Sequence, residues 1–276
     1  MAGLIEGLPS GLRGDYAGLG ADLTLAQDMA GYAPADHATW RSLYARQAAL
    51  LPCHAAAAFR EGLDRLPFAA GIPDFARCSA LLRAATGWVL VAVPGLIPDA
   101  AFFGHLAARR FPVTRWIRRR EELDYIVEPD VFHDAFGHVP LLTQPDFADF
   151  LQAYGAMGET AARIGALKPL ARLYWHMVEF GLIREGRDPR LWRRHPLLRR
   201  RDAACDRGRC AAPAALRPAA GAAQRLPHRS VQPTYFGIGG YAELFATMPA
   251  LPALLAEARD AAPIPPGAAA PGDQPL

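Results

Sequence analysis

Apolar residues between positions 167 and 182 recur at spacings of three, four, seven and eight, which is typical of an amphipathic helix packed against a core. Further helices are predicted over residues 38–63, 75–85, 98–109, 147–158 and 241–247. Residues 88–93 alternate poorly between apolar and polar positions but are rich in valine, so a short buried strand is expected there. The predicted fold class is therefore mainly α with a few short strands.

The length of 276 residues allows one large domain with a substantial core or two modest ones. We predict one main domain over residues 36–250, preceded by an N-terminal extension over residues 1–35. The tail, residues 261–276, is rich in proline, alanine and glycine and is expected to be disordered. No apolar run approaches the ~20 residues of a membrane-spanning helix, and no signal-peptide pattern is present. We expect a cytoplasmic protein with no membrane partner.

The net charge of +3 is unevenly distributed along the sequence. Residues 187–229 contain twelve arginines and three aspartates but no lysine or glutamate, so this segment alone carries +9. The rest of the chain therefore carries −6 and has the composition of an acidic enzyme. Because a basic face for nucleic-acid phosphates is confined to one unusual stretch, we expect no nucleic-acid partner.

Two histidines flank an acidic and apolar segment in the run EPDVFHDAFGH, residues 128–138. Two imidazoles with one carboxylate are the ligand set of non-heme Fe(II) oxygenases. In zinc proteases the histidines lie four residues apart on one helical face, whereas His133 and His138 lie five apart. Five residues rotate an α-helix by roughly 140°, so both rings face one ion only if the helix ends or bends between them. We expect that break at Gly137, with His133 in the last turns and His138 just past the end.

The carboxylate for the same site is offered by Glu179, within the helical segment 167–182. An unpaired buried charge is rarely tolerated, so Glu179 is expected at the exposed edge of the apolar stripe or buried with a partner such as a metal ion. Taken singly, each histidine is more often structural, and Glu179 is more often solvated or paired with His176. The combination favours a metal site.

These residues resemble those of the pterin-dependent aromatic amino acid hydroxylases, and most of all the short bacterial phenylalanine 4-hydroxylases. The likeness extends over separate blocks in the expected order. The blocks are WRSLYARQ from residue 40, GWVLVAVPGLI from 87, FPVTRWIR from 111, the two-histidine motif, YW from 174 as far as residue 186, and QPTYF from 232. Several blocks in order are more specific than one two-histidine pattern. The resemblance implies a single hydroxylase-like catalytic iron domain over residues 36–250.

The resemblance also implies roles for individual residues. The iron ligands, which are also the catalytic residues, would be His133, His138 and Glu179. Arg118 would hold the amino acid carboxylate through its planar fork of donors, with Asp130 orienting it. The other implied substrate contacts are Trp175 and Phe180, and the implied pterin contacts are the backbone of Gly95 and Leu96, the stacking ring of Phe102, and Asp134 and Tyr174.

Some of these residues have a simpler interpretation when the resemblance is set aside. Arg118 lies in the charged run RRREE, residues 118–122, and such a run is usually a solvated face. Phe102 and Trp175 would be taken as core residues, because large aromatic side chains most often fill interiors.

The activity implied by the resemblance is a monooxygenation of L-phenylalanine to L-tyrosine. The implied cofactors are Fe(II) and a tetrahydropterin, tetrahydrobiopterin or a related compound. The expected partners are therefore L-phenylalanine, O2 and the reduced pterin. A monomer is expected, because no heptad-rich C-terminal helix for tetramer formation and no separate regulatory domain are visible. The preference among phenylalanine, tyrosine and tryptophan stays open, because hydroxylases of all three share the ligand set.

The resemblance fails over residues 187–229, which are rich in arginine, alanine and proline. In the relatives this segment is rich in glycine and carries serine and glutamate residues that help to close the substrate pocket. One hypothesis is a pair of compensating frameshifts, or a sequencing error, in GC-rich coding DNA. The other is an authentic insertion that tends toward disorder. In both cases we expect metal binding more firmly than turnover, because the three implied iron ligands precede this segment.

Two alternatives to an active hydroxylase stay open on the sequence. A zinc-dependent hydrolase would use the same three ligands with Asp134 as its base, and it would bind zinc tightly without responding to a reduced pterin. A catalytically impaired or inactive relative would persist as a binding scaffold or as a pseudogene product.

The frameshift hypothesis predicts that resequencing the gene will reveal a shifted reading frame over codons 187–229. The corrected translation is expected to be rich in glycine and to continue the family pattern. An unshifted frame across these codons would contradict the hypothesis.

Overall fold

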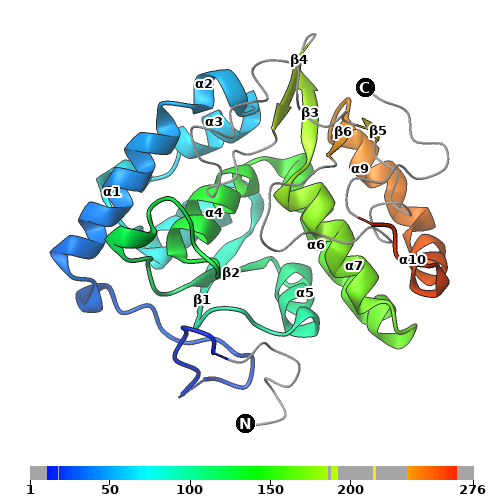
Figure 1. Ribbon diagram of the computed structural model, residues 1–276, viewed down its shortest axis with the longest axis horizontal. Coiled ribbons are helices and arrows are strands. Elements are labelled where there is room, and N and C mark those ends of the chain that lie inside the picture. The colour runs from blue at the N-terminus through cyan, green and yellow to red at the C-terminus, as the bar shows by residue number, and fades with distance from the viewer. Residues whose placement is uncertain (1–10, 18, 186–187, 192–213, 216–234, 266–276) are drawn as a thin grey trace. The chain divides into compact units, whose positions relative to one another are not determined.

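The computed structural model describes residues 11–17, 19–185, 188–191, 214–215 and 235–265 (Figure 1). The chain divides into two compact units, the first formed by residues 1–156 and 194–197 and the second by residues 157–193 and 198–276. The described chain is mainly helical with short strands, as the sequence predicts.

The first unit begins with a short 3-10 helix at Met29–Gly31 and a series of helices. These are α1 (Pro34–Ala48), α2 (Leu51–His54), α3 (Ala57–Asp64), α4 (Phe75–Thr86) and α5 (Asp99–Ala107), with 3-10 helices at Phe68–Ala70 and Arg120–Glu122. The last helix of this unit, α6 (Pro145–Arg163), contains the boundary to the second unit.

The single helix predicted over residues 38–63 is wrong, because the structure has three helices there. Pro52 has no backbone N–H and cannot donate to the carbonyl of Ala48, so α1 cannot continue through it. Ala55 and Ala56 then take extended backbone angles and separate α2 from α3.

The helix predicted over residues 75–85 is confirmed as α4, and both of its ends have a local cause. The side chain of Asp74 accepts a hydrogen bond from the backbone N–H of Arg77 at 3.0 Å, which satisfies one of the free donors of the first turn. Gly87 ends the helix in the left-handed region, with φ of +80°.

Two parallel strands follow α4, and the loops that leave them begin side by side. Strand β1 (Val89–Val93) confirms the predicted strand, and β2 (Arg110–Thr114) pairs with it in parallel, with Val93 opposite Thr114. Helix α5 forms the crossover between them, because parallel strands cannot be joined by a tight turn (Figure 1). The loops that leave the carboxyl ends of both strands, residues 94–98 and 115–119, therefore begin at the same edge of the sheet.

An aromatic cluster in the first unit supports the segment that carries the two histidines. The ring of Phe132 stacks on that of Phe136 with 4.8 Å between centroids and contacts Trp40 of α1 at 5.0 Å. All three side chains are fully buried. The indole N–H of Trp40 donates to the carbonyl of Phe68 at 2.6 Å, so the ring buries its area without leaving a polar atom unpaired.

The second unit consists of helices and a small sheet. The helices are the end of α6, α7 (Leu167–Tyr174), a π-helix at Trp175–Glu179, α9 (Ala242–Thr247), a 3-10 helix at Met248–Ala250 and α10 (Leu251–Asp260). The strands are β3 (Leu182–Glu185), β4 (Asp188–Leu191), β5 (Ala214–Ala215) and β6 (Phe236–Ile238), in the order β4-β3-β6-β5. The helix predicted over 167–182 is therefore too long, because Leu182 begins β3.

The unusual segment 187–229 lies largely outside the described residues. The parts of it that the structure describes are strand β4, antiparallel to β3, and the short strand β5, parallel to β6. The predicted tail, residues 261–276, is described only as far as residue 265.

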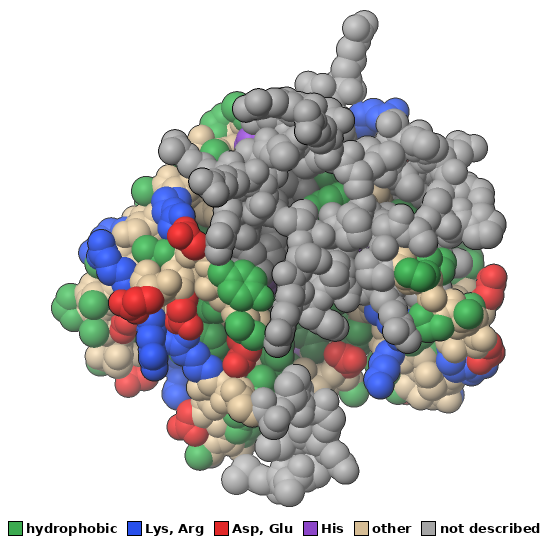
Figure 2. Space-filling view, viewed as in Figure 1, with side chains coloured by type: hydrophobic (Ala, Val, Ile, Leu, Met, Phe, Trp, Pro, Cys, Tyr) green, Lys and Arg blue, Asp and Glu red, His purple; other side chains and the backbone are tan. Residues whose placement is uncertain are grey.

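The described residues form no long apolar helix, and the charges on their surface are of both signs. Among the residues described, no helix has the length and apolar character needed to cross a membrane. Basic and acidic side chains are intermixed over the described surface visible in Figure 2.

Close packing of α3 on the 3-10 helix Val139–Thr143 predicts a large effect of one small substitution. A Cβ on Gly62 would lie 2.0 Å from the carbonyl oxygen of Pro140, so Gly62→Ala is expected to destabilise the protein by about 1–3 kcal/mol in urea unfolding. The matched control is Gly104→Ala in α5, where nothing lies within 4 Å of a new Cβ, and it is expected to cause no loss. Equal unfolding midpoints for both variants would contradict this packing.

Candidate metal centre

The two histidines of the sequence motif lie on one short helical stretch of the first unit. Residues Phe132–Phe136 form a π-helix, and a 3-10 helix over Val139–Thr143 follows. Gly137 has right-handed helical angles, φ −73° and ψ −33°, so the break predicted at Gly137 is wrong. The wider π turn, with its i→i+5 hydrogen bonds, brings side chains five residues apart toward the same side instead.

His133 and His138 are close enough to share one ion. Their ring centroids are 5.3 Å apart, and one potential ligand atom from each of His133, Asp134 and His138 lies within 4.8 Å of the others. Both histidines are buried. Two imidazoles fit iron or zinc rather than magnesium or calcium, which prefer oxygen ligands.

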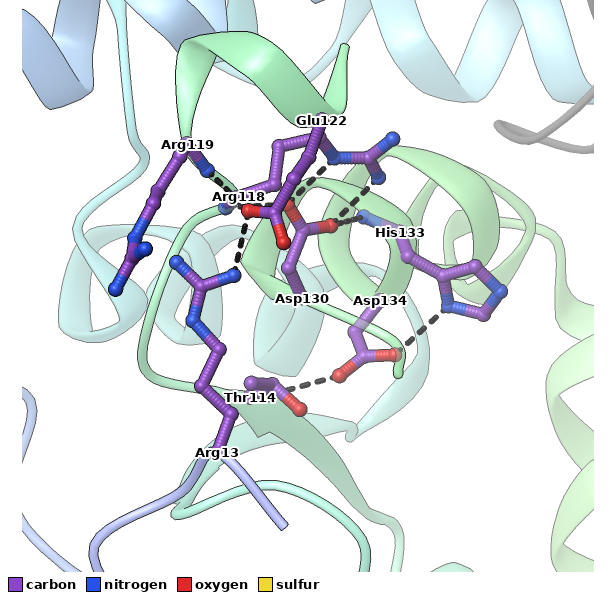
Figure 3. A network of polar contacts seen from close by, with 8 residues as sticks. All are labelled: Arg13, Thr114, Arg118, Arg119, Glu122, Asp130, His133 and Asp134. Atoms are coloured by element: carbon purple, nitrogen blue, oxygen red, sulfur yellow. Dashed lines mark hydrogen bonds and ion pairs between the residues drawn. The ribbon is translucent and has the colours of Figure 1, made fainter. Parts of the chain in front are cut away.

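Asp134 holds the first histidine in position. Its Oδ1 lies 3.0 Å from Nδ1 of His133, and its Oδ2 accepts a hydrogen bond from the backbone N–H of Thr114 at 2.8 Å (Figure 3). Because a carboxylate can only accept, Nδ1 carries the proton in this arrangement, and a metal ion would bind through Nε2. The anchor at Thr114 connects this histidine to the end of β2.

The pair of Arg118 and Asp130 is fully buried beside the same helix. Oδ2 of Asp130 accepts from the backbone N–H of Arg118 at 2.9 Å and from its Nε at 2.8 Å, and Oδ1 accepts from its Nη2 at 2.8 Å. Oδ1 also accepts from the backbone N–H of His133 at 2.9 Å (Figure 3). The interpretation of residues 118–122 as a wholly solvated face is wrong for Arg118, which is 1% exposed.

The charge of Arg118 determines how Asp130 titrates. Burial alone would raise the pKa of Asp130, but the hydrogen bonds and positive charge of Arg118, together with the backbone N–H of His133, outweigh burial and hold that pKa below its usual value. The carboxylate therefore stays charged, and the pair is a compensated ion pair rather than an isolated buried charge.

Arg118 retains a donor for a ligand. Its Nη1 is buried and has no hydrogen-bond partner among the described residues, while Nε and Nη2 are both bound to Asp130. A buried guanidinium N–H without an acceptor is costly, so this donor is suited to a carboxylate or another anion.

The predicted cofactor residues of the first unit lie on the loop after β1 and on α5. The backbone carbonyl of Leu96 accepts a hydrogen bond from the hydroxyl of Tyr16 at 2.8 Å. A Cβ on Gly95 would lie 3.6 Å from Nε1 of Trp116 and 3.8 Å from Oε2 of Glu128, both buried atoms with no partner among the described residues. Phe102, on α5, is half-buried.

The remaining predicted residues belong to the second unit. Tyr174 ends α7, and Glu179 ends the π-helix Trp175–Glu179 and is buried. The rings of Trp175 and Phe180 are stacked with 6.0 Å between centroids, and Trp175 is 42% exposed. The roles of these four residues at one site with the two histidines stay predictions.

Several residues that support the site had no predicted role. Thr114 contributes its backbone N–H, and the residue type gives no indication of such a donor. Trp116 and Glu128 lie in the segments FPVTRWIR and EPDVFHDAFGH, but their spacing does not indicate a site. Tyr16 lies in the predicted N-terminal extension, far from every motif in sequence.

Comparison with known proteins identifies relatives over most of the chain. Residues 26–250 match the family described as biopterin-dependent aromatic amino acid hydroxylase. A phenylalanine-4-hydroxylase of Ralstonia nicotianae is 57% identical over 182 residues, which cover 66% of this chain and 58% of that relative. One of Chromobacterium violaceum is 60% identical over 163 residues, covering 59% of this chain and 55% of the relative. The match thus spans less than two thirds of either curated relative.

Solved structures of the C. violaceum phenylalanine hydroxylase have the same fold. The cobalt-bound form superposes with a TM-score of 0.89 at 45% identity, covering 94% of this chain and 95% of that one. The form with iron and phenylalanine bound has a TM-score of 0.86 at 44% identity, covering 93% and 94%.

The buried pair predicts a strong dependence of stability on Asp130. Asp130→Asn leaves the guanidinium of Arg118 buried without its counter-charge and is expected to reduce the free energy of unfolding by about 3–5 kcal/mol in urea titrations. The matched control is Asp124→Asn, which breaks the exposed pair with Arg46 and is expected to cost less than about 1 kcal/mol. Similar losses for the two variants would show that the buried pair is not a special support.

Proposed function

Because the chain belongs to the biopterin-dependent aromatic amino acid hydroxylase family, we propose that it hydroxylates L-phenylalanine to L-tyrosine with Fe(II), O2 and a tetrahydropterin. The observation that carries the proposal is the buried convergence of His133 and His138 beside the pair of Arg118 and Asp130. Phenylalanine is favoured as substrate because the relatives at 57% and 60% identity are phenylalanine-4-hydroxylases.

The residues present fit an iron ion. Nε2 of His133 and a ring nitrogen of His138 would be two ligands, and by the family resemblance Glu179 would be the third. Three protein ligands leave positions for exogenous ligands. When bound, Fe(II) and the tetrahydropterin would supply the activation of O2 and the electrons, which the side chains cannot supply. Asp134 would keep the imidazole of His133 oriented toward the metal by holding its Nδ1–H.

The amino acid would be held by its carboxylate. Nη1 of Arg118 is the donor that Asp130 does not use, so it would donate to the substrate carboxylate while Asp130 keeps the guanidinium in place. An arginine fixed before the substrate arrives loses little side-chain freedom on binding. The stacked rings of Trp175 and Phe180 would provide apolar surface for the phenyl ring.

The reduced pterin would bind to the loop after β1 and to α5. The backbone of Gly95 and Leu96 would bind its polar edge, the ring of Phe102 would stack on it, and Asp134 and Tyr174 would line its site. We propose further that the chain acts as a monomer in the cytoplasm.

The zinc-hydrolase alternative is not favoured by the contacts of Asp134. One carboxylate oxygen is next to Nδ1 of His133 and the other accepts from Thr114, so Asp134 is engaged as a support rather than available as a general base. The catalytically impaired alternative is decided by experiment.

The decisive experiment is tyrosine formation by the purified chain. Tyrosine is expected only when Fe(II), O2, a tetrahydropterin and phenylalanine are all present, and zinc in place of iron is expected to give none. His133→Ala and Glu179→Ala are each expected to reduce bound iron and to lower the rate by more than roughly 100-fold, because they remove ligands rather than their supports.

The control is His54→Ala, which removes a half-buried histidine of α2 and is expected to retain iron and rate. A chain that takes up iron but forms no tyrosine would be the impaired relative. A chain that takes up no iron with both histidines intact would contradict the metal site itself.

A further inference from the structure

The N-terminal segment of residues 13–16, here called the strap, is bound to two loops of the first unit. The backbone N–H of Arg13 donates to Oε1 of Glu128 at 3.0 Å. The Nη1 of Arg13 pairs with Oε2 of Glu122 at 2.6 Å (Figure 3). The guanidinium carbon of Arg13 lies 4.5 Å from the ring centroid of Trp116, within the range of a cation–π contact. The strap is thus fixed to the loop that leads from β2 to the histidine helix.

The other side of the strap lies against residues 94–97 of the loop after β1. A Cβ on Gly14 would lie 2.2 Å from the carbonyl oxygen of Pro94, so the backbone approaches this loop as closely as only glycine permits. Two residues later, the hydroxyl of Tyr16 donates to the carbonyl of Leu96 at 2.8 Å. Burial, and secondly the nearby charge of Glu128, raise the pKa of Tyr16 to about 12, so the hydroxyl keeps its proton at neutral pH and remains a donor.

This hydrogen bond controls the orientation of a peptide group. Fixing the carbonyl of Leu96 also fixes the plane of the peptide bond that contains the N–H of Ile97. A Cβ on Gly95 would lie 3.2 Å from the same tyrosine oxygen and 3.6 Å from the buried Nε1 of Trp116. The strap therefore helps to shape the backbone surface that a ligand of residues 95–97 would meet.

We propose that the strap positions the cofactor loop 94–97 and that Tyr16 is a positioning residue for the reduced pterin. The proposal rests on the proposed function in one respect, namely that the pterin binds to the backbone of Gly95 and Leu96. The strap lies before residue 26, where the match to the hydroxylase family begins, so the family match assigns it no role.

The first test measures backbone amide exchange in the loop in the absence of any pterin. Amide hydrogen exchange of Gly95, Leu96 and Ile97 is compared between the wild type and Tyr16→Phe, which removes the hydroxyl and keeps the ring. Exchange is expected to become roughly 3- to 10-fold faster in the variant, as the loss of one hydrogen bond implies. Tyr32→Phe is the matched control, because it removes a tyrosine hydroxyl that donates to the carbonyl of Arg115, outside the 94–97 loop.

The second test measures ligand affinity by calorimetry with 7,8-dihydrobiopterin, which binds without turnover, and separately with L-phenylalanine. Tyr16→Phe is expected to weaken pterin binding roughly 3- to 10-fold and to leave the affinity for phenylalanine within about twofold. A general loss of folding would weaken the binding of both ligands alike. Weaker binding of the pterin alone therefore indicates that Tyr16 positions the pterin loop.

The outcomes separate this proposal from the proposed function. Unchanged exchange at residues 95–97 together with unchanged pterin affinity in Tyr16→Phe would overturn the role of the strap. Equal weakening of both ligands would overturn it as well. A wild type that binds no pterin would contradict the proposed function, and the exchange measurement would still decide whether Tyr16 holds the loop.

Discussion

The carboxylate of Asp130 is the constraint on which the first unit's site depends. It accepts hydrogen bonds from the backbone and side chain of Arg118 and from the backbone N–H of His133. One buried charge thereby joins the residue proposed to hold the substrate carboxylate to the helix that carries the proposed metal ligand His133. A buried pair of this kind contributes little net stability compared with an apolar pair, but it requires one arrangement of the groups it connects. We infer that its role is to fix geometry before any ligand binds.

The topology of the first unit brings other residues of the proposed site to the same edge of the sheet. Because β1 and β2 are parallel, the loops that follow them start at one edge of the sheet. The first loop carries Gly95 and Leu96, and the second leads to Arg118. The π-helix Phe132–Phe136 then allows two histidines five residues apart to approach one ion, and the ring of Phe132 anchors it on Trp40. The ligand geometry thus depends on an aromatic core as well as on the polar contacts.

The sequence predicted the fold class better than it predicted the backbone around the two histidines. The fold class and the strand over residues 88–93 followed from residue types, because short-range preference and burial agree there. The break at Gly137 was wrong because a glycine indicates a possible end of a helix, whereas a π turn has no residue signature. Arg118 in its charged run looked solvated, since its partner Asp130 lies twelve residues away in the sequence. Backbone donors such as the N–H of Thr114 cannot be read from side chains at all.

We infer that the two histidines bind a metal ion through a geometry that Asp134 and Asp130 impose. Anomalous diffraction at the iron edge from crystals grown with Fe(II) tests it most directly. We expect one strong peak within bonding distance of Nε2 of His133 and of a ring nitrogen of His138, with Nδ1 of His133 still bound to Asp134. A peak on Nδ1 of His133, or no peak beside these two rings, would contradict it.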